Sequence, residues 1–347
     1  MSLSVKRVTA DEVEVTFVDE PGDATTLSVV IGPRIGLNPI GTAFTSVPGT
    51  SSRALTLRMR SDLRFSYVFV RDGERVPDPF NPPPRFSECA VERFSGASVA
   101  VLPDAAPLPW LEQAERLPPP VLESAVLGDE RRIWVSMPPS NERALPFVIH
   151  LDGTPDHSAP SVRDALVQAG QIRPCAVVLV EQLQRDEELL CNPAFSQLLV
   201  EELLPWLHQR YPLSRDPRDV ALAGESFGGL CAAWTALHHP TTFGNAILQS
   251  PSCGYHPDSG WGLAELQRRA PVPTLMADFL AADTAPIRIF HDVGELESSL
   301  THSRWLDLVL TGKGYDTRYR EFAGGHDYAW WRGLFADALQ WCFPLEA

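Results

Sequence analysis

The stretch DVALAGESFGGLCAAW, residues 219–234, decides how this chain is interpreted. A run of small and β-branched apolar residues leads to Gly224, Ser226 and Gly228, and a helix-forming run follows. The pattern fits G-x-S-x-G in the context that it requires, a strand, a sharp turn and a helix. The stretch therefore predicts a nucleophile elbow that presents the Ser226 hydroxyl, with a helix dipole behind it that favours a developing negative charge.

Such a serine needs a histidine and an acid later in the chain, in the order serine, acid, histidine. His326 stands in the glycine-flanked stretch FAGGHDYAWWR, after the last predicted strand and before the last predicted helix. The stretch FHDVGELESSL offers Asp292, Glu295 and Glu297, of which Asp292 is expected to lie still within a strand. His326 is thus the predicted base, and the spacing leaves Glu295 and Glu297 open as the acid that orients it.

An oxyanion hole requires two backbone N–H groups. The first is predicted to come from Phe227, the residue after the serine. The second is predicted to come from the loop in FVIHLDGTPDH, residues 147–157, where Gly153 or Thr154 is the candidate. The alternative for Gly153 is a plain turn glycine.

The two halves of the chain differ in the spacing of their apolar residues and turn signals. Residues 1–120 carry short alternating β-type segments between turn signals, which predicts a small immunoglobulin-like β-sandwich. Residues 121–347 alternate apolar strands with longer helical patterns, such as FSQLLVEELLPWLHQR at 195–210. The second half therefore predicts an α/β domain with a mostly parallel sheet covered by helices on both faces.

Composition restricts the classes of function. The net charge is −15, and the basic residues form no run, which argues against nucleic acid as a partner. No apolar run approaches the ~18 residues of a membrane span, and no secretory leader is visible, so a cytoplasmic protein without membrane contact is expected. The six cysteines form no CxxC pair and predict reduced, mostly buried thiols. No zinc motif is present, so no metal is expected.

These motifs, taken in order, resemble the enterochelin (enterobactin) esterase family. The stretch RDEELLCNPAF at 185–195 matches the family's R-x-x-E-L-x-C-N-x-x-F, and GESFGGL and GGHDYAWWR match its serine and histidine motifs. The resemblance covers most of the chain. It implies an α/β-hydrolase fold preceded by a β-sandwich, and a cytoplasmic serine esterase that cleaves the trilactone of a ferric catecholate siderophore without a cofactor, since iron enters only with the substrate.

The resemblance also implies site residues. The family's G-x-x-E places the acid on Glu297, with Glu295 second, and its motif places Arg185 near the substrate. The alternative for Arg185 is a structural salt bridge with Glu188. The sequence departs from the family pattern at SPSCGYHP, residues 250–257, and after LDG, where the usual tryptophan is missing.

Two other functions remain open at this stage. A general carboxylesterase would use the same Ser226, His326 and Glu297 on a smaller ester. A catalytically silent protein would use the β-sandwich to hold a ligand. The sequence leaves the oligomeric state open between monomer and dimer.

Overall fold

The structure is a computed structural model that describes residues 2–19, 27–31, 44–88, 95–258 and 272–345. Contacts divide it into two units. The first unit contains Met1–Leu108 together with two later segments, Gly294–Glu297 and Phe322–Arg332. The second unit contains Pro109–Val293, Ser298–Glu321 and Gly333–Ala347. The domain boundary at residue 120 stays a prediction.

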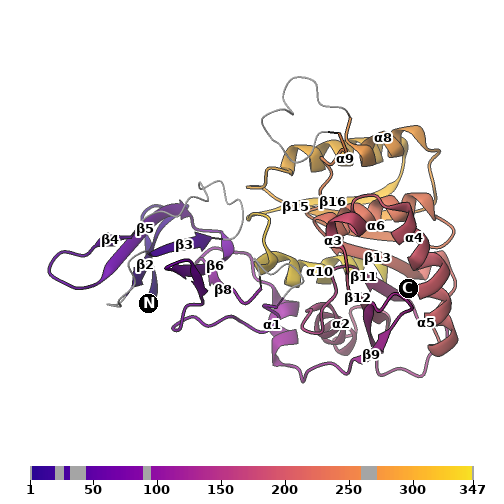
Figure 1. The fold of residues 1–347 in the computed structure, drawn as a ribbon, viewed down its shortest axis with the longest axis horizontal. Helices are drawn as coiled ribbons and strands as arrows, with labels where there is room; N and C mark the ends of the chain where they lie inside the picture. Colours follow the sequence, from indigo (N-terminus) through magenta and orange to yellow (C-terminus); the bar gives the residue numbers. More distant parts are fainter. Residues whose placement is uncertain (1, 20–26, 32–43, 89–94, 259–271, 346–347) are drawn as a thin grey trace. The chain divides into compact units, whose positions relative to one another are not determined.

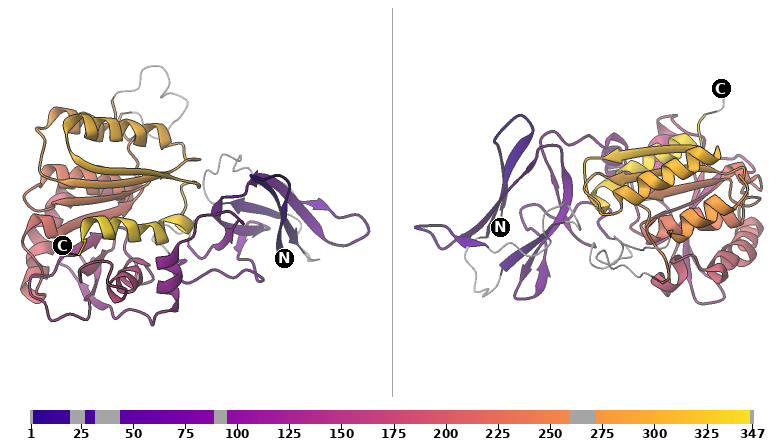
Figure 2. Two further views of the ribbon diagram at one scale, coloured as in Figure 1. Left: turned by 180° about the vertical axis from the view of Figure 1, so that it is seen from behind. Right: turned by 90° about the horizontal axis from the view of Figure 1, so that it is seen from above.

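The first unit is built on two antiparallel sheets, which Figures 1 and 2 draw in indigo and violet. One sheet has the order β1-β2-β5-β4, and in the other β6 lies between β3 and β7 and also pairs with β8. The strands are β1 (Ser2–Arg7), β2 (Glu12–Asp19), β3 (Leu27–Ile31), β4 (Thr45–Ser46), β5 (Arg53–Arg60), β6 (Arg64–Arg71), β7 (Glu74–Val76) and β8 (Ser98–Val101).

Alternating side chains from both sheets form a single core. In β2, Val13, Val15 and Phe17 are buried while their neighbours are half exposed, as the period of a strand requires. They share the core with Phe65 and Phe69 of β6, which lies in the other sheet. Two sheets that share one core make a β-sandwich, so the predicted fold of the first half is confirmed.

The second unit is built on an eight-stranded sheet with the order β16-β15-β14-β13-β11-β12-β10-β9. Strands β12, β11, β13, β14 and β15 run parallel, whereas β10 is antiparallel to β12 and β9. The strands are β9 (Glu123–Val126), β10 (Arg132–Ser136), β11 (Phe147–His150), β12 (Ala176–Val180), β13 (Val220–Glu225), β14 (Asn245–Gln249), β15 (Arg288–Gly294) and β16 (Asp316–Phe322).

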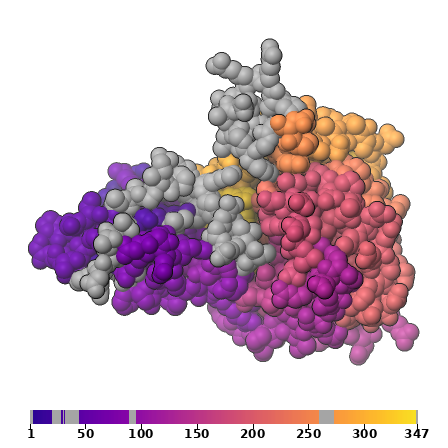
Figure 3. All heavy atoms as spheres, in the orientation of Figure 1, coloured from indigo at the N-terminus to yellow at the C-terminus, as the bar shows by residue number. Residues whose placement is uncertain are grey.

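Helices lie on both faces of this sheet, with α2 and α10 on one face and α4 and α6 on the other (Figures 1 and 2). Helices α8 and α9 pack on each other and form a continuous orange surface in Figure 3. The helices are α1 (Pro109–Arg116), α2 (Ala159–Gln168), α3 (Arg185–Leu189), α4 (Pro193–Leu198), η2 (Leu199–Leu203), α5 (Leu204–Arg210), η3 (Pro217–Asp219), α6 (Phe227–His238), α8 (Thr274–Ala281), α9 (Leu300–Lys313) and α10 (Tyr328–Cys342).

The sequence predicted this architecture well, with two differences. The single helix expected over residues 195–210 is instead α4 and α5 joined by the π-helical turn η2. Pro205, which has no N–H to donate, stands at the start of α5, where the helical hydrogen bonding changes. The strands β1, β4, β7 and β9 were not predicted. Strands β4, β7 and β9 are only two to four residues long, and the alternation of Leu3 and Val5 in β1 was not recognised as a strand.

The sheet brings three strand ends to one edge. Strands β13, β14 and β15 are parallel. Strand β16 runs the same way as β15, because Arg288 Nε meets Asp316 Oδ2 at 2.9 Å where both strands begin, and Glu295 N–H donates to Phe322 O at 2.9 Å where they end. The carboxyl ends of β13, β15 and β16 therefore share an edge, which is where open α/β sheets bind ligands.

The described cysteines are free thiols, as predicted. Cys175, Cys231, Cys253 and Cys342 are buried, and Cys191 is half-buried. Burial raises the pKa of Cys175, Cys231 and Cys342 to about 12, so these thiols stay protonated and unreactive. Cys89 lies outside the described residues.

Candidate active site

Ser226 occupies a strained turn between β13 and α6. Its φ is 56° and its ψ is −111°, a region that side-chain-bearing residues rarely adopt. The backbone is fixed from two sides, because Ser226 N–H donates to Gln249 O at 2.9 Å and Ser226 O accepts from Ser252 N–H at 2.9 Å. This is the geometry of a nucleophile elbow, which the sequence pattern predicted.

Gly224, two residues before Ser226, is required by the close approach of two backbone segments. A Cβ on Gly224 would lie 2.6 Å from the carbonyl carbon of Gly228, far inside van der Waals contact. Strand and helix can therefore meet only if residue 224 has no side chain. The hydroxyl of Ser226 lies half-buried, with its Oγ 3.2 Å from Ser252 Oγ.

His326 and Glu297 form a hydrogen-bonded pair within the first unit. His326 Nδ1 lies 2.7 Å from Glu297 Oε2, and both side chains are largely buried. Glu297 Oε1 accepts from Gly294 N–H at 2.7 Å, which fixes the carboxylate. A carboxylate at Nδ1 holds the imidazole proton there and leaves Nε2 as the basic nitrogen.

The structure distinguishes the three acids that the sequence left as candidates. Glu297 is the one that contacts His326. Glu295 instead accepts from Arg60 Nη1 at 2.6 Å. Asp292 lies in β15, as expected, where its side chain is fully buried and paired with Arg320 at 3.1 Å.

The structure argues against Gly153 as the second oxyanion donor. Its N–H donates to Val180 O at 2.9 Å, so that group is already used between neighbouring strand ends. A Cβ on Gly153 would lie 2.5 Å from Val180 N, so the glycine serves the close approach of the two chains. The alternative, Thr154, follows directly, and its Oγ is buried without a hydrogen-bond partner among the described residues.

Phe227 is the first residue of α6, which starts immediately after Ser226. The positive end of the helix dipole lies there, next to the serine. The Phe227 ring stacks under the guanidinium of Arg185, 5.0 Å from ring centroid to Cζ. The structure thus has Phe227 at the start of the helix, directly after the serine, as predicted.

Arg185 is paired, but not with the partner that the sequence offered. It binds the buried carboxylate of Asp152 through Nε, at 2.8 Å to Oδ1 and 2.9 Å to Oδ2. Burial disfavours its charge, but Asp152 outweighs this and raises the pKa of Arg185. Glu188, the alternative partner that the sequence offered, binds Arg131 at 2.8 Å instead. Arg131 was not foreseen, because it stands more than 50 residues earlier.

Glu225, directly before the nucleophile, belongs to a buried cluster with two histidines that sequence reasoning missed. Glu225 Oε1 lies 3.5 Å from His150 Nε2 and 3.4 Å from His157 Nε2. Burial opposes its charge, but the two histidines lower the pKa of Glu225. Burial lowers the pKa of His150 to about 4 despite the neighbouring carboxylate, so His150 is neutral near pH 7.

The three side chains could be taken for metal ligands, because their donor atoms lie within 4.8 Å of one another. The hydrogen bonds of His157 argue otherwise. Its Nδ1 accepts from Ala159 N–H at 3.1 Å, so a neutral His157 carries its proton on Nε2. That nitrogen presents an N–H to Glu225 rather than a lone pair to an ion, which favours a hydrogen-bonded pair.

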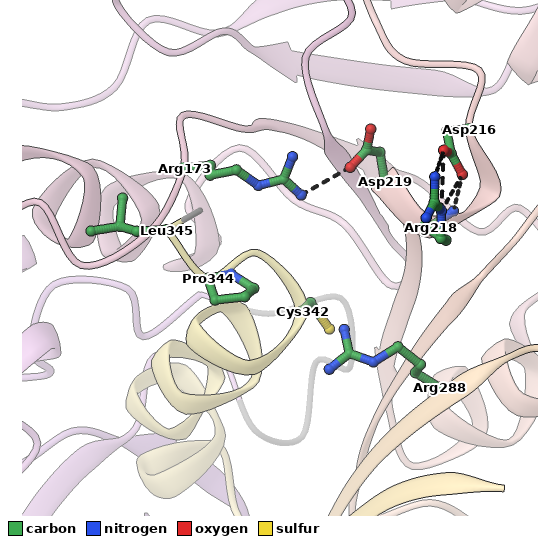
Figure 4. Close-up of a pocket in the computed structure, with 8 residues that line it drawn as sticks. All are labelled: Arg173, Asp216, Arg218, Asp219, Arg288, Cys342, Pro344 and Leu345. Atoms are coloured by element: carbon green, nitrogen blue, oxygen red, sulfur yellow. Dashed lines mark hydrogen bonds and ion pairs between the residues drawn. The ribbon is translucent and has the colours of Figure 1, made fainter. Parts of the chain in front are cut away.

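A separate pocket lies at the opposite edge of the sheet, next to the first residues of β13 and β15 (Figure 4). Its volume is about 380 Å³. Its arginines are paired, because Arg173 binds Asp219 at 2.9 Å and Arg218 binds Asp216 at 2.6 Å. Their charges are offset, and the pocket contains none of the predicted site residues. It is lined by Arg173, Asp216, Arg218, Asp219, Arg288, Cys342, Pro344 and Leu345.

A mostly parallel sheet with helices on both faces and a serine elbow after one of its central strands define the α/β-hydrolase class. Residues 124–342, more than half of the chain, match the family described as "Putative esterase". The chain therefore belongs to this esterase family and is a hydrolase that acts on esters. Among the described residues, no helix is both long and apolar enough to cross a membrane.

Individual relatives are named siderophore esterases, and one of them matches more of the chain than the family does. The iron(III) enterobactin esterase of Dickeya dadantii is 29% identical over 345 residues, covering 85% of this chain and 78% of the relative. The iron(III) salmochelin esterase of Escherichia coli O6:H1 is 29% identical over 224 residues, covering 62% of this chain and 54% of the relative.

A solved structure shares the fold of nearly the whole chain. It is the enterobactin esterase from Shigella flexneri in the presence of 2,3-di-hydroxy-N-benzoyl-serine, with a TM-score of 0.82 and 22% identity. The match covers 98% of this chain and 95% of that chain. The predicted fold class, an α/β-hydrolase preceded by a β-sandwich, is thus confirmed.

Proposed function

We propose that Ser226, His326 and Glu297 form a catalytic triad. The observation that carries this is the 2.7 Å hydrogen bond between His326 Nδ1 and Glu297 Oε2. It is supported by the strained elbow at Ser226 and by the sheet topology, since the three residues follow strands whose carboxyl ends share one edge. This is the constellation that activates a serine hydroxyl for acyl transfer.

In this mechanism, Ser226 Oγ attacks the ester carbonyl while His326 Nε2 takes its proton. Glu297 holds the imidazole tautomer and stabilises the imidazolium that forms. The oxyanion is held by the N–H groups of Phe227 and, in place of Gly153, Thr154. His326 then protonates the leaving alcohol, and water releases the acyl group by the same steps in reverse.

The proposed substrate is the trilactone of a ferric catecholate siderophore. Support comes from the relatives named iron(III) enterobactin and iron(III) salmochelin esterase, the first of which matches 85% of this chain. Hydrolysis of the scaffold would weaken the iron complex, because its three catechol arms are no longer preorganised on one ring. The reaction needs no resident cofactor, since iron enters with the substrate, and we place it in the cytoplasm.

A second candidate, a general carboxylesterase, is favoured by one observation. A ferric catecholate is anionic, while the chain carries a net charge of −15. Arg185 was the cation expected to bind this substrate, and its charge is offset by Asp152. The segment 250–257, where the sequence departs from the siderophore esterases, follows β14 and includes Ser252, the neighbour of Ser226.

The two candidates are separated by one experiment with two substrates. Purified protein is incubated with ferric enterobactin and, separately, with a short aryl ester, and the products are resolved by chromatography. Ser226→Ala is the negative control. Ser161→Ala is the matched control, because Ser161 is a buried serine in α2 outside the proposed triad.

Stepwise release of catechoyl-serine units by the wild type and by Ser161→Ala, but not by Ser226→Ala, is the expected result. Ser226-dependent cleavage of the aryl ester alone would establish the second candidate. If neither ester is cleaved, the triad proposal is wrong.

A further inference from the structure

The acid and the base of the proposed triad lie in the same unit as the β-sandwich, although both follow strands of the large sheet. The segments Gly294–Glu297 and Phe322–Arg332 carry Glu297 and His326. They are joined to each other through the backbone, because Leu296 N–H donates to Gly324 O at 3.0 Å. Whatever fixes either segment therefore also affects the hydrogen bond between Glu297 and His326.

The acid segment is held by strand β5. Arg60, the last residue of β5, donates from Nη1 to Glu295 Oε2 at 2.6 Å. Arg60 is itself oriented by Asp62, which accepts from its Nε at 2.9 Å and from its Nη2 at 2.6 Å. The next residue, Leu296, packs against the core of the sandwich. Both residues before Glu297 are thus anchored on the sandwich.

The base segment is held by strand β6. Asp327, next to His326, accepts Ser66 N–H at 2.6 Å through Oδ2 and Ala329 N–H at 2.9 Å through Oδ1. Among the described residues, β3 pairs with β6 from Arg71 to Tyr67, and Asp327 accepts the N–H of Ser66, the residue that precedes this paired stretch. The carboxylate is buried and joins a sandwich strand to the start of α10.

Two further contacts hold the same segment. Arg64 of β6 lies over the ring of Trp330, 5.4 Å from its centroid. Arg332 donates to Arg85 O at 2.9 Å. With Asp327, these contacts fix the first turn of α10, directly after the base.

We infer that the β-sandwich is a positioning element for the acid–base pair, acting through Arg60 on Glu295 and through the β6 backbone on Asp327. Neither Arg60 nor Asp327 touches the reacting atoms, so both act through Glu297 and His326. The inference rests on the proposed function, because it assigns a role in the same triad. General-base catalysis is sensitive to such positioning, since a 1 Å misplacement can cost ~10²-fold in rate.

The Arg60–Glu295 pair is better suited to positioning than to stability. The two side chains are 41% and 36% exposed, and ion pairs at such sites contribute little to the free energy of unfolding. Its loss should therefore change the rate more than the melting temperature. That difference separates a positioning role from a structural one.

The test compares Arg60→Met with Arg58→Met. Arg58 stands on the same strand and makes an exposed ion pair with Glu12, away from the acid and base segments. For each variant, kcat and KM are measured on an aryl ester, together with the melting temperature. Arg60→Lys and Glu295→Gln complete the set, with the double variant Arg60→Met/Glu295→Gln.

We expect Arg60→Met and Glu295→Gln each to lower kcat by about ten-fold with KM within about two-fold, a partial loss of positioning. The double variant should be no worse than either single variant, because the same contact is lost. Arg60→Lys should restore part of kcat, and Arg58→Met should match the wild type. Unchanged kcat in Arg60→Met would overturn the inference, as would a change seen equally in Arg58→Met.

A measurement that needs no turnover separates this inference from the proposed function. The proton between His326 Nδ1 and Glu297 Oε2 is followed by its downfield NMR resonance, assigned by its loss in Glu297→Gln. We expect the resonance to shift or broaden in Arg60→Met and to stay unchanged in Arg58→Met. If the wild type cleaves no ester, the proposed function fails while this resonance still decides the inference; a resonance unmoved in Arg60→Met overturns it.

Discussion

The nucleophile elbow and the acid–base segments are held in different ways. Ser226 is fixed by its own neighbourhood, through the close approach of Gly224 to the backbone of Gly228 and through hydrogen bonds to Gln249 and Ser252. Glu297 and His326 are fixed by distant residues, through contacts of Glu295 and Asp327 with the sandwich. The elbow is thus held by local contacts and the acid–base segments by tertiary contacts, so the two regions should respond differently to substitution.

The largest effect should separate the two glutamates of the acid segment. Glu297→Gln keeps the shape of the side chain but removes the charge that stabilises the imidazolium, so kcat should fall by about 10³- to 10⁴-fold. Glu295→Gln, two residues earlier, should cost only about ten-fold, because it only loosens the anchor. Steady-state kinetics on an aryl ester measure both. Equal losses in the two variants would mean that the acid is misassigned.

The next prediction tests the local contacts that hold the elbow. Gly224→Ala forces a Cβ to within 2.6 Å of Gly228, so the strand and helix must separate and Ser226 must move. We expect kcat to fall by about 10²-fold and the free energy of unfolding to fall by about 3 kcal/mol. Gly312→Ala in α9 is the control, since a Cβ there meets nothing within 4 Å. A Gly224→Ala variant with wild-type kinetics would contradict the steric account of the elbow.

The third prediction concerns pH and the elbow's buried surroundings. Burial lowers the pKa of His150 from 6.5 to about 4, so the unfolded chain binds more protons than the fold between these values. The stability due to neutral His150 is therefore complete above pH 6.5 and is lost as the pH falls toward 4, by roughly 3 kcal/mol.

Urea unfolding at a series of pH values measures this dependence. In His150→Gln the slope between pH 6.5 and 4 should be smaller than in the wild type. An identical slope in both proteins would show that His150 is not the group responsible.

The smallest expected change in stability concerns the strained backbone of Ser226. Ser226 holds a φ of 56°, which costs a side-chain-bearing residue about 1–3 kcal/mol. Ser226→Gly should abolish hydrolysis and raise the free energy of unfolding by about 1 kcal/mol, since glycine adopts this φ without strain but loses more chain entropy. Urea unfolding of Ser226→Gly and Ser226→Ala isolates the effect of backbone strain at residue 226, because both variants lack the hydroxyl. Equal free energies of unfolding in the two variants would contradict the predicted strain.

The same contrast explains what could be predicted from the sequence. The elbow was predicted in full, because its glycines, serine and flanking strand lie within a few residues of one another. The strands of both halves were predicted wherever apolar alternation or apolar runs were strong. Short strands such as β9, with only half-buried or exposed side chains, gave no such signal.

Contacts between residues far apart in the sequence could not be predicted from the sequence alone. Spacing alone left Glu295 and Glu297 open, because the difference between them is made by Arg60 and His326, which come from other elements. The alternative salt bridge of Arg185 with Glu188 was wrong for the same reason, since Asp152, the residue that Arg185 binds, lies 33 residues earlier while Glu188 lies in the same helix. The histidines around Glu225 were likewise brought together only by the fold of β11 and the loop after it.

The contacts that hold the acid–base segments join residues that are far apart in the sequence. Arg60 and Glu295 are 235 residues apart, and Ser66 and Asp327 are 261 residues apart. Contacts of such separation close very long loops and form late in folding. During synthesis the sandwich leaves the ribosome first, and the segments that it holds leave near the end. Hydrolytic activity should therefore report completed folding more sharply than secondary structure does.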